Sequence, residues 1–322
     1  MPLIKGSSYR RPSLLCNAHL ETVIPSLTRK FNLLIRKSRV KVKTPDDDFL
    51  LVDEYNTSSR KAVIISHGLE GDSERPYVLG MVNRFIREEY NVYAWNFRGC
   101  GGELNKVARM YHSGATYDLE TIVSYVCAKN YETVSVIGFS LGGNLTLKYL
   151  GEYSYPENLK SAVAISVPLD LAGCSNQIDS PKNAFYARRF LISLTEKTTR
   201  KREQMPHILP HLKKIKFNSL FQFDDLVTAP LHGFDGADHY YASNSSISFI
   251  DKIKIPTLVI NAKNDPFLSD SCLDPSYFKS SENVYFEMPK FGGHVGFYTF
   301  GQDNVFWSEE RALRFITLQD RL

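Results

Sequence analysis

The spacing of apolar residues changes along the chain in the way that is typical of alternating strands and helices. Short apolar runs rich in β-branched residues indicate buried strands, and apolar residues spaced three or four apart indicate helices. The expected strands lie at residues 62–66, 92–97, 134–139, 162–167, 257–262 and 284–288, and the expected helices at residues 77–89, 117–128, 143–151 and 304–318. Because strands that alternate with helices pair in parallel through right-handed crossovers, the pattern predicts an α/β fold with a mostly parallel sheet flanked by helices.

Two regions interrupt this alternation. Residues 38–43 and 49–55 form an expected hairpin, joined by a turn-rich segment that contains Pro-Asp-Asp-Asp. Beyond the strand at 162–167 the pattern is lost in a long stretch rich in aromatic residues, which we expect to be a helical cap inserted between two core strands. The predicted units are an irregular or helical arm (1–37), the first part of the core (38–170), the cap (171–250) and the second part of the core (251–322).

A Gly-x-Ser-x-Gly pentapeptide at residues 138–142 reads Gly-Phe-Ser-Leu-Gly and lies where a β-rich apolar run meets a helical pattern. This context is typical of a nucleophile elbow, in which a serine at a sharp strand-to-helix turn exposes its hydroxyl above the sheet. Small residues on either side allow the strained turn without side-chain clashes. Ser140 is therefore the candidate nucleophile.

Two later residues complete a candidate proton relay. Asp265 and His294 each follow an expected strand, and the chain order Ser, Asp, His is the one that this elbow predicts. Serine is a weak nucleophile, so His294 is needed to accept its proton and Asp265 to hold the imidazole and stabilise its charged form. Asp170, which follows the strand before that of Asp265, is the alternative acid.

A glycine-flanked loop at residues 67–71, His-Gly-Leu-Glu-Gly, follows another buried strand. We expect the backbone N–H groups of Leu141, directly after the serine, and of Leu69 in this loop to bind the oxyanion of the tetrahedral intermediate. Each such donor contributes roughly 3–4 kcal/mol to transition-state stabilisation. His67 is expected to take part in the hydrogen bonding of the loop rather than to act as a second base.

Further short motifs extend from one end of the chain to the other. They are Asn-Ala-His-Leu-Glu-Thr at 17–22, Asn-Phe-Arg-Gly-Cys at 96–100, Tyr-His-Ser-Gly at 111–114, Thr-Ala-Pro-Leu-His-Gly-Phe at 228–234, Asn-Asp-Pro-Phe at 264–267 and Gly-Gly-His-Val-Gly-Phe at 292–297. Together with the elbow and the loop, they resemble the YheT-like group of α/β-hydrolases, also called the AB hydrolase 4 family. The resemblance implies triad roles for Ser140, Asp265 and His294. The chain departs from it at Asn264, where many relatives carry a second acidic residue.

Members of that family are mainly carboxylic-ester hydrolases, and some eukaryotic relatives are acyl-alcohol transferases or lipases. The resemblance and the relay together predict cleavage of a carboxylic ester, with a short to medium acyl chain, through a seryl acyl-enzyme. Acyl transfer to an alcohol, or lipase or thioesterase activity, would use the same residues. A non-catalytic ligand-binding protein on the same fold is the alternative outside enzymes.

The composition limits the classes of partner that we expect this protein to bind. The chain has 322 residues, 43% of them hydrophobic and 23% charged, which is enough for one large core and an insertion. A net charge of +4 without a recognisable binding module argues against nucleic acid. No apolar stretch approaches the ~18 residues of a membrane span, so we expect no integral membrane segment, while peripheral membrane contact stays open. A small or lipid-like ester is the expected partner.

Metal and redox chemistry are not expected either. Five widely spaced cysteines form no Cys-x-x-Cys pair, which favours reduced thiols and a cytoplasmic location. His207 and His211 lie four apart, but neighbouring prolines and the missing His-Glu-x-x-His frame argue against a zinc site. The adjacent Asp224 and Asp225 are expected to be solvated or to cap a helix. The sequence therefore predicts no metal and no cofactor.

Overall fold

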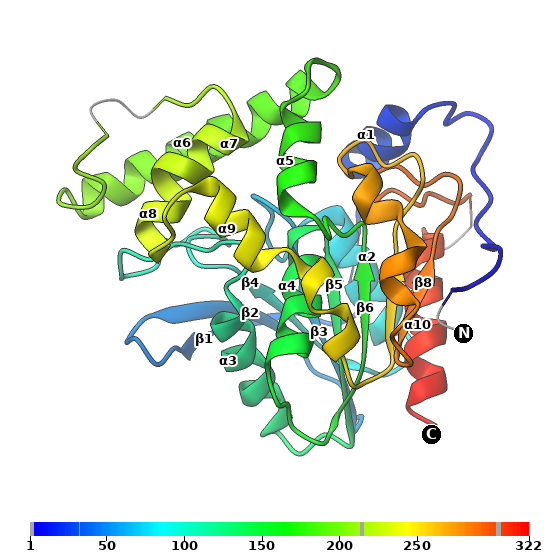
Figure 1. The fold of residues 1–322 in the computed structure, drawn as a ribbon. Coiled ribbons are helices and arrows are strands. Elements are labelled where there is room, and N and C mark those ends of the chain that lie inside the picture. The colour runs from blue at the N-terminus through cyan, green and yellow to red at the C-terminus, as the bar shows by residue number, and fades with distance from the viewer. Residues whose placement is uncertain (1–2, 32, 213–215, 301–303, 322) are drawn as a thin grey trace.

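A central sheet organises the chain in a computed structural model that describes residues 3–31, 33–212, 216–300 and 304–321. Within these ranges the sheet has eight strands in the order β1-β2-β4-β3-β5-β6-β7-β8 (Figure 1). The strands are β1 Ser38–Lys43, β2 Phe49–Tyr55, β3 Lys61–Ser66, β4 Asn91–Asn96, β5 Thr133–Phe139, β6 Leu159–Ile165, β7 Thr257–Ile260 and β8 Val284–Glu287. The hairpin β1–β2 joins β4 in antiparallel fashion, and all other neighbours pair in parallel. The predicted mostly parallel α/β fold is confirmed.

Helices cover both faces of this sheet. They are α2 Pro76–Ile86 and α10 Trp307–Gln319 on one face, and α3 Thr116–Cys127 and α4 Leu141–Glu152 on the other, while α1 Ala18–Thr28 packs beside α2. Consecutive strand residues alternate between the faces, so Val136 of β5 joins the core under α3 and α4, and Ile137 joins the core under α2 and α10. Both faces are buried, which explains the continuous apolar runs of the central strands. Within the described ranges, no helix has the length and apolar character that a membrane crossing requires.

Helices and turns fill the chain between β6 and β7. They are α5 Leu171–Asp179, η1 Pro181–Asn183, α6 Ala184–Gln204, α7 Leu220–Phe223, the π-helical turn η2 Asp224–Thr228, α8 Ala229–His232, α9 Ala237–Asn244, η3 Ser246–Ser248 and η4 Ile250–Lys252. In Figure 1 the helices α5 to α8 lie beyond the carboxyl ends of the parallel strands, whereas η3 and η4 lie beside α4. The acid-bearing loop after β7 adds the short 3₁₀ turns η5 Asp270–Leu273 and η6 Pro275–Phe278.

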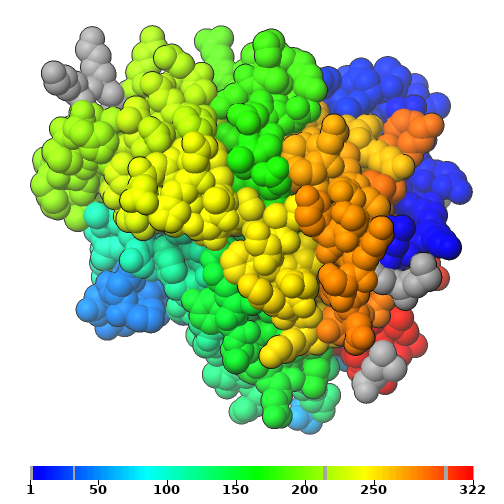
Figure 2. Space-filling view, in the orientation of Figure 1, coloured from blue at the N-terminus to red at the C-terminus, as the bar shows by residue number. Residues whose placement is uncertain are grey.

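The N-terminal arm reaches the same end of the molecule. Figure 2 shows it, in blue, along the upper edge of this face beside the green helical segment. The His19 imidazole of α1 and the Tyr186 hydroxyl of α6 are 3.2 Å apart, so the two segments are in contact. The division of the chain into arm, core and cap stays a prediction, and residues 1–2, 32, 213–215, 301–303 and 322 of those units lie outside the described residues.

Two expected helices are present with different ends. The helix α2 ends at Ile86 because Glu89 adopts a left-handed backbone conformation, with φ of 62°. The helix α10 begins at Trp307 because the Glu309 carboxylate accepts a hydrogen bond from the Phe306 N–H, 2.9 Å away, and fixes the first turn there. Both helices are confirmed, and the predicted boundaries at residues 89 and 304 are wrong.

Candidate active site

Ser140 lies at a strained turn between β5 and α4. Its backbone has φ 52° and ψ −119°, a conformation that residues with side chains rarely adopt. A Cβ atom on Gly138 would lie 2.3 Å from the Gly142 carbonyl oxygen, and one on Gly142 would lie 2.5 Å from the His67 carbonyl oxygen. The turn closes this tightly because both positions are glycine, and the predicted strand–turn–helix around Ser140 is confirmed.

Three side chains from distant parts of the sequence meet at this turn. The His294 Nε2 atom is 3.0 Å from the Ser140 Oγ atom. The His294 Nδ1 atom is 2.9 Å from Asp265 Oδ2 and 3.1 Å from Asp265 Oδ1. Asp265 is only 5% exposed, and its Oδ1 atom also accepts a hydrogen bond from the Phe267 N–H. The structure thus brings together the three residues that the sequence singled out.

The carboxylate fixes the tautomer of the imidazole. An ionised carboxylate can only accept hydrogen bonds, so Nδ1 of His294 carries the proton that it donates to Asp265. The Nε2 atom is then free to accept the proton of the Ser140 hydroxyl. The Phe267 ring lies 4.3 Å from the imidazole ring and covers it on one side. This arrangement can remove a proton from a serine during attack on a carbonyl carbon.

The loop that carries His294 is held from two sides. The His294 N–H donates to Thr22 Oγ1 of α1 at 2.9 Å, and the Val295 N–H donates to Ser166 Oγ at 2.9 Å. Gly293 in this loop has a φ of 59°, and a Cβ atom there would lie 2.8 Å from the Thr22 hydroxyl. The sequence did not predict these roles of Thr22 and Ser166. The motif at 17–22 was the one signal that pointed to the first of them.

Asn264 joins the same loop to a buried carboxylate. Its amide nitrogen donates to the Glu21 Oε2 atom, and its amide oxygen accepts from the Gly293 N–H at 3.2 Å. Glu21 is fully buried, and burial raises the pKa of its carboxyl group. An acidic residue at position 264 would face this carboxylate without offering it a donor. In this chain, the amide of Asn264 therefore suits the carboxylate of Glu21.

The alternative acid, Asp170, has other partners. It is the N-cap of α5, where its Oδ1 atom accepts from the Gly173 N–H at 3.1 Å. Its Oδ2 atom accepts from the Ser271 hydroxyl at 2.6 Å. Among the described residues, the acid that bonds to the His294 imidazole is Asp265.

His67 serves the loop that contains it. Its Nδ1 atom donates to the Gly68 carbonyl oxygen at 2.8 Å, and its Nε2 atom accepts from the Phe97 N–H at 3.2 Å. Burial lowers the pKa of His67 to about 3, so the ring is neutral at physiological pH. Both nitrogens are occupied by backbone groups, which confirms the expected role in loop hydrogen bonding.

The backbone donors expected for an oxyanion lie on two touching segments. A Cβ atom on Gly68 would be 3.1 Å from the Ser140 Cβ atom, so the loop before Leu69 packs directly against the nucleophile. Leu69 and Leu141 both line the cavity that reaches Ser140. In the described parts of the chain, neither of their N–H groups has an acceptor, which leaves both free for a ligand oxygen.

An ion pair links this loop to α6. The Glu70 Oε1 atom is 2.6 Å from the Lys197 ammonium, and Glu70 also accepts hydrogen bonds from the Ser193 and Tyr111 hydroxyls. Burial acts to raise the pKa of Glu70, but the Lys197 charge and these hydrogen bonds lower it overall. Glu70 therefore stays charged and ties the loop of Leu69 to a helix of the segment between β6 and β7.

Two cavities meet at Ser140. The first has a volume of about 100 Å³ and extends under α5, α6 and α7, with mostly apolar walls. The second has a volume of about 220 Å³ and opens toward α1 and α2, with more polar walls that include Arg75 and Arg189. Ser140 and His294 line both cavities, as do Leu69 and Phe267. The site can thus hold two different groups on either side of one reacting centre.

Asp224 and Asp225 have different roles in the structure, although the same role was expected for both. Asp225 accepts a hydrogen bond from the Ala237 N–H at 3.0 Å, at the start of α9, as expected for a helix-capping residue. Asp224 instead lines the first cavity and bonds to Thr228 and Tyr241, so the expectation of a solvated or capping role is wrong for it. The Tyr241 hydroxyl of α9, which packs against η2, holds this side chain toward the cavity.

The chain belongs to the family of the alpha/beta hydrolase fold, whose family model matches residues 61–300. "Putative esterase YheT" of Escherichia coli (strain K12) is 31% identical to it over 288 residues, which cover 87% of this chain and 84% of that protein. The resemblance inferred from the motifs is thereby confirmed.

A second sequence relative and a solved structure are also similar to this chain. The monoacylglycerol lipase of Saccharomyces cerevisiae is 29% identical over 294 residues, which cover 88% of this chain and 64% of the lipase. The structure of the Pyrococcus furiosus esterase Pf2001 superposes with a TM-score of 0.59 at 17% identity, over 88% of this chain and 93% of the esterase, and shows the same fold. The two sequence relatives from Escherichia coli and Saccharomyces cerevisiae are thus an esterase and a lipase by name.

Proposed function

We propose that this protein hydrolyses carboxylic esters, with Ser140 as the nucleophile, His294 as the general base and acid, and Asp265 as the partner of the imidazole. The observation that carries the proposal is the continuous series of hydrogen bonds from the Asp265 carboxylate through the imidazole to the Ser140 hydroxyl, at 2.9 and 3.0 Å. The names of its relatives, an esterase and a monoacylglycerol lipase, support an ester as the substrate class.

The reaction would proceed in two halves. The Ser140 oxygen attacks the ester carbonyl carbon while its proton passes to His294 Nε2, and the π electrons of the carbonyl move onto its oxygen. When the intermediate collapses, the bond to the alcohol oxygen breaks and His294 returns the proton to the departing alcohol. Water then attacks the acyl-enzyme in the same way, and the acid and Ser140 are released.

The developing oxyanion would be bound by the N–H groups of Leu69 and Leu141. Both belong to segments that pack against Ser140 and have no acceptor within the described residues. Donors that are already in place stabilise the transition state without reorganisation, and loss of one costs about 2.7–4 kcal/mol. Backbone groups cannot be removed by substitution, so this part of the proposal is tested through the residues that hold the loop.

We further propose that the helices between β6 and β7 act as a cap over Ser140. Leu194 of α6, Leu220 of α7 and Leu171 of α5 line the first cavity. Apolar walls around a small volume suit a short to medium acyl chain and keep bulk water from the acyl-enzyme. The wider second cavity would then receive the alcohol part of the ester and the attacking water.

Acyl transfer to an alcohol is the second candidate reaction, and the second cavity favours it. That cavity opens at Ser140 with about 220 Å³, which leaves room for an acceptor alcohol in place of water. If the protein is a transferase, an added alcohol diverts the acyl group into a new ester at the expense of the free acid. If it is a hydrolase, the free acid remains the main product at all alcohol concentrations that leave the protein folded.

The test of the proposal is hydrolysis of p-nitrophenyl esters of increasing chain length. The Ser140→Ala variant is expected to lose activity by about 10⁴-fold or more, as in other serine hydrolases that lose the nucleophile. Ser135→Ala is the matched control, because Ser135 lies on the same strand β5 and bonds to Ser161 inside the sheet. Equal activity of the two variants would contradict the proposal.

A further inference from the structure

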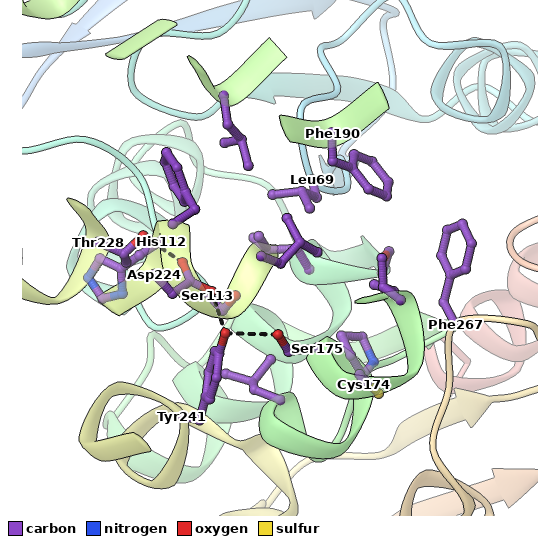
Figure 3. A pocket seen from close by; sticks show the side chains of 18 of the residues that line it. Leu69, His112, Ser113, Cys174, Ser175, Phe190, Asp224, Thr228, Tyr241 and Phe267 are labelled. Carbon is purple, nitrogen blue, oxygen red and sulfur yellow. Dashed lines mark hydrogen bonds between the residues drawn. The ribbon is translucent and has the colours of Figure 1, made fainter. Parts of the chain in front are cut away.

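The first cavity ends in a polar cluster, although most of its walls are apolar. Figure 3 shows Asp224, Thr228, Tyr241 and Ser175 gathered on one side of this cavity, away from Phe267, which covers the His294 imidazole. Apolar side chains from α5, α6 and α7 line the same cavity as the cluster and Ser140, and they are Leu171, Ile178, Leu194, Leu220 and Phe223. A group bound at Ser140 can therefore extend along a largely apolar cavity toward the cluster.

Asp224 in this cluster lacks a compensating charge. Its Oδ1 atom accepts from the Thr228 hydroxyl at 2.6 Å, and its Oδ2 atom accepts from the Tyr241 hydroxyl at 2.7 Å. A carboxylate offers about four acceptor sites, so about half of its capacity is unused. Among the described residues Asp224 forms no ion pair, and the charge that acts on it most is another carboxylate, Asp179. Such a group is costly to bury unless a ligand completes its hydrogen bonds.

The direction of the hydroxyl protons defines what the cluster offers to a ligand. Thr228 and Tyr241 both donate their protons to the ionised Asp224 carboxylate. The Tyr241 and Ser175 hydroxyl oxygens are 2.9 Å apart, and because the Tyr241 proton is already used, Ser175 is the donor of that bond. All three protons point into the cluster. Asp224, Thr228 and Ser175 therefore each keep lone pairs that can accept a hydrogen bond from a ligand.

The backbone here is also unusual. Residues Asp224–Thr228 form a π-helical turn between α7 and α8, and its first and last residues are the two of this turn that line the cavity. Single π turns within helices are energetically unfavourable and occur frequently at functional sites. This turn places the Thr228 hydroxyl against the Asp224 carboxylate, to which it donates.

We propose that the cluster of Asp224, Thr228, Tyr241 and Ser175 is a specificity subsite that binds a hydrogen-bond donor, a hydroxyl or an amino group, at the far end of the substrate's acyl chain. The acyl group is the part that fits here, because it stays bound through both halves of the reaction and belongs in the narrower cavity. The preferred ester is then one with a polar-ended acyl chain rather than a plain alkyl chain. This inference rests on the proposed ester hydrolysis at Ser140.

The test compares p-nitrophenyl esters of matched chain length that end in a methyl, a methoxy, a hydroxyl or an amino group. Methoxy accepts hydrogen bonds but cannot donate them, so it separates donation from polarity. Sites built to bond a substrate donor discriminate strongly against analogues without it, and we expect kcat/KM at the best chain length to favour the hydroxyl or the amino ester over the methoxy ester by at least about tenfold. Preference for the amino ester indicates a charged donor, and preference for the hydroxyl ester a neutral one.

Substitutions in the cluster test whether its residues cause the preference for esters that end in a hydrogen-bond donor. In Asp224→Asn the ratio of kcat/KM between donor and methoxy esters is expected to fall to about one, and Thr228→Val is expected to reduce it as well. The ratio compares two substrates on one preparation, so it does not depend on the folded fraction, and Thr228→Val gives the answer if the first variant does not fold. Asp225→Asn is the control, because that neighbouring carboxylate caps α9, and it keeps the wild-type ratio.

The outcomes are distinct from those of the proposed function. A wild-type enzyme that cleaves p-nitrophenyl acetate but shows a ratio of one at every chain length overturns the subsite and leaves ester hydrolysis standing. An unchanged ratio in active Asp224→Asn or Thr228→Val overturns it as well. Absence of all esterase activity in the folded wild type overturns the proposed function itself.

Discussion

The Glu70 carboxylate and the Lys197 ammonium form an ion pair, 2.6 Å apart, that is almost completely shielded from solvent. Glu70 directly follows Leu69, whose N–H is the proposed oxyanion donor, and Lys197 lies on α6. Glu70 has a φ of 51°, a strained conformation that its side-chain bonds help to maintain. The pair thus couples the position of the Leu69 N–H to α6, in the segment between β6 and β7.

Substitution of this lysine is expected to slow the reaction more than it weakens binding. In Lys197→Met the loop loses its anchor, and an oxyanion donor that is displaced by a fraction of an ångström stabilises the transition state less. We expect kcat per active site, counted by fluorophosphonate titration, to fall about tenfold with KM nearly unchanged. Lys41→Met, which breaks the exposed pair with Glu103, is the control. Equal kcat values in the two variants would show that the ion pair does not position the loop.

Asn264→Asp is expected to destabilise the loop of His294. The new carboxylate would face buried Glu21 and could no longer donate to it. Leaving buried polar groups without partners costs about 1–3 kcal/mol each, so the free energy of unfolding should fall by that amount at neutral pH. Chemical denaturation measures the change.

Glu21→Gln provides the rescue for this variant. In the double variant the glutamine amide can donate to the carboxylate introduced at position 264, which restores the bond with its direction reversed. Recovery of most of the lost stability is expected. A single variant as stable as the wild type, or a double variant no better than the single one, would show that the two side chains are not coupled.

The stability of the protein is expected to depend on pH through Asp224. Burial raises the pKa of this carboxyl from its usual value near 3.8 to about 6, with the Asp179 charge acting in the same direction. The folded state then binds the proton more tightly than the unfolded state, so the favourable contribution is complete below pH ~4 and is lost as the pH rises to ~6. The loss is about 3 kcal/mol, from about two pKa units at 1.36 kcal/mol each.

The Asp224→Asn variant lacks the titrating carboxyl group, so its stability does not contain this pH-dependent contribution. We expect the difference in unfolding free energy between the variant and the wild type to shift in favour of the variant as the pH rises between 4 and 6. Denaturation curves at several pH values measure it, and Asp225→Asn serves as the reference for an adjacent carboxylate. A pH-independent difference would mean that Asp224 keeps its ordinary pKa in the folded protein.

Local patterns in the sequence were sufficient for the sheet and for the centre of the site. The strand-to-helix change around Ser140 follows from an apolar run, two obligatory glycines and a helical spacing, all within a short segment. Asp265 and His294 were found because each follows a strand. At the carboxyl edge of a parallel sheet, residues that follow different strands come close together.

The supporting contacts could not be predicted in this way. Thr22 and Glu21 reach the His294 loop from more than 240 positions away in the chain, and no periodicity relates those segments. The expectation failed for Asp224 because the sequence does not distinguish two adjacent aspartates, of which Asp225 caps a helix. The π turn that sends the two carboxylates in different directions leaves no mark in a pattern of apolar spacing.

Covalent labelling tests the central claim most directly. A fluorophosphonate should react with the folded protein at one serine, and mass spectrometry of the digested protein should place the adduct on Ser140. Labelling should be lost in Ser140→Ala and strongly reduced in His294→Ala, because the imidazole activates the hydroxyl. An adduct on another serine, or a folded wild-type protein that does not react, would contradict the account.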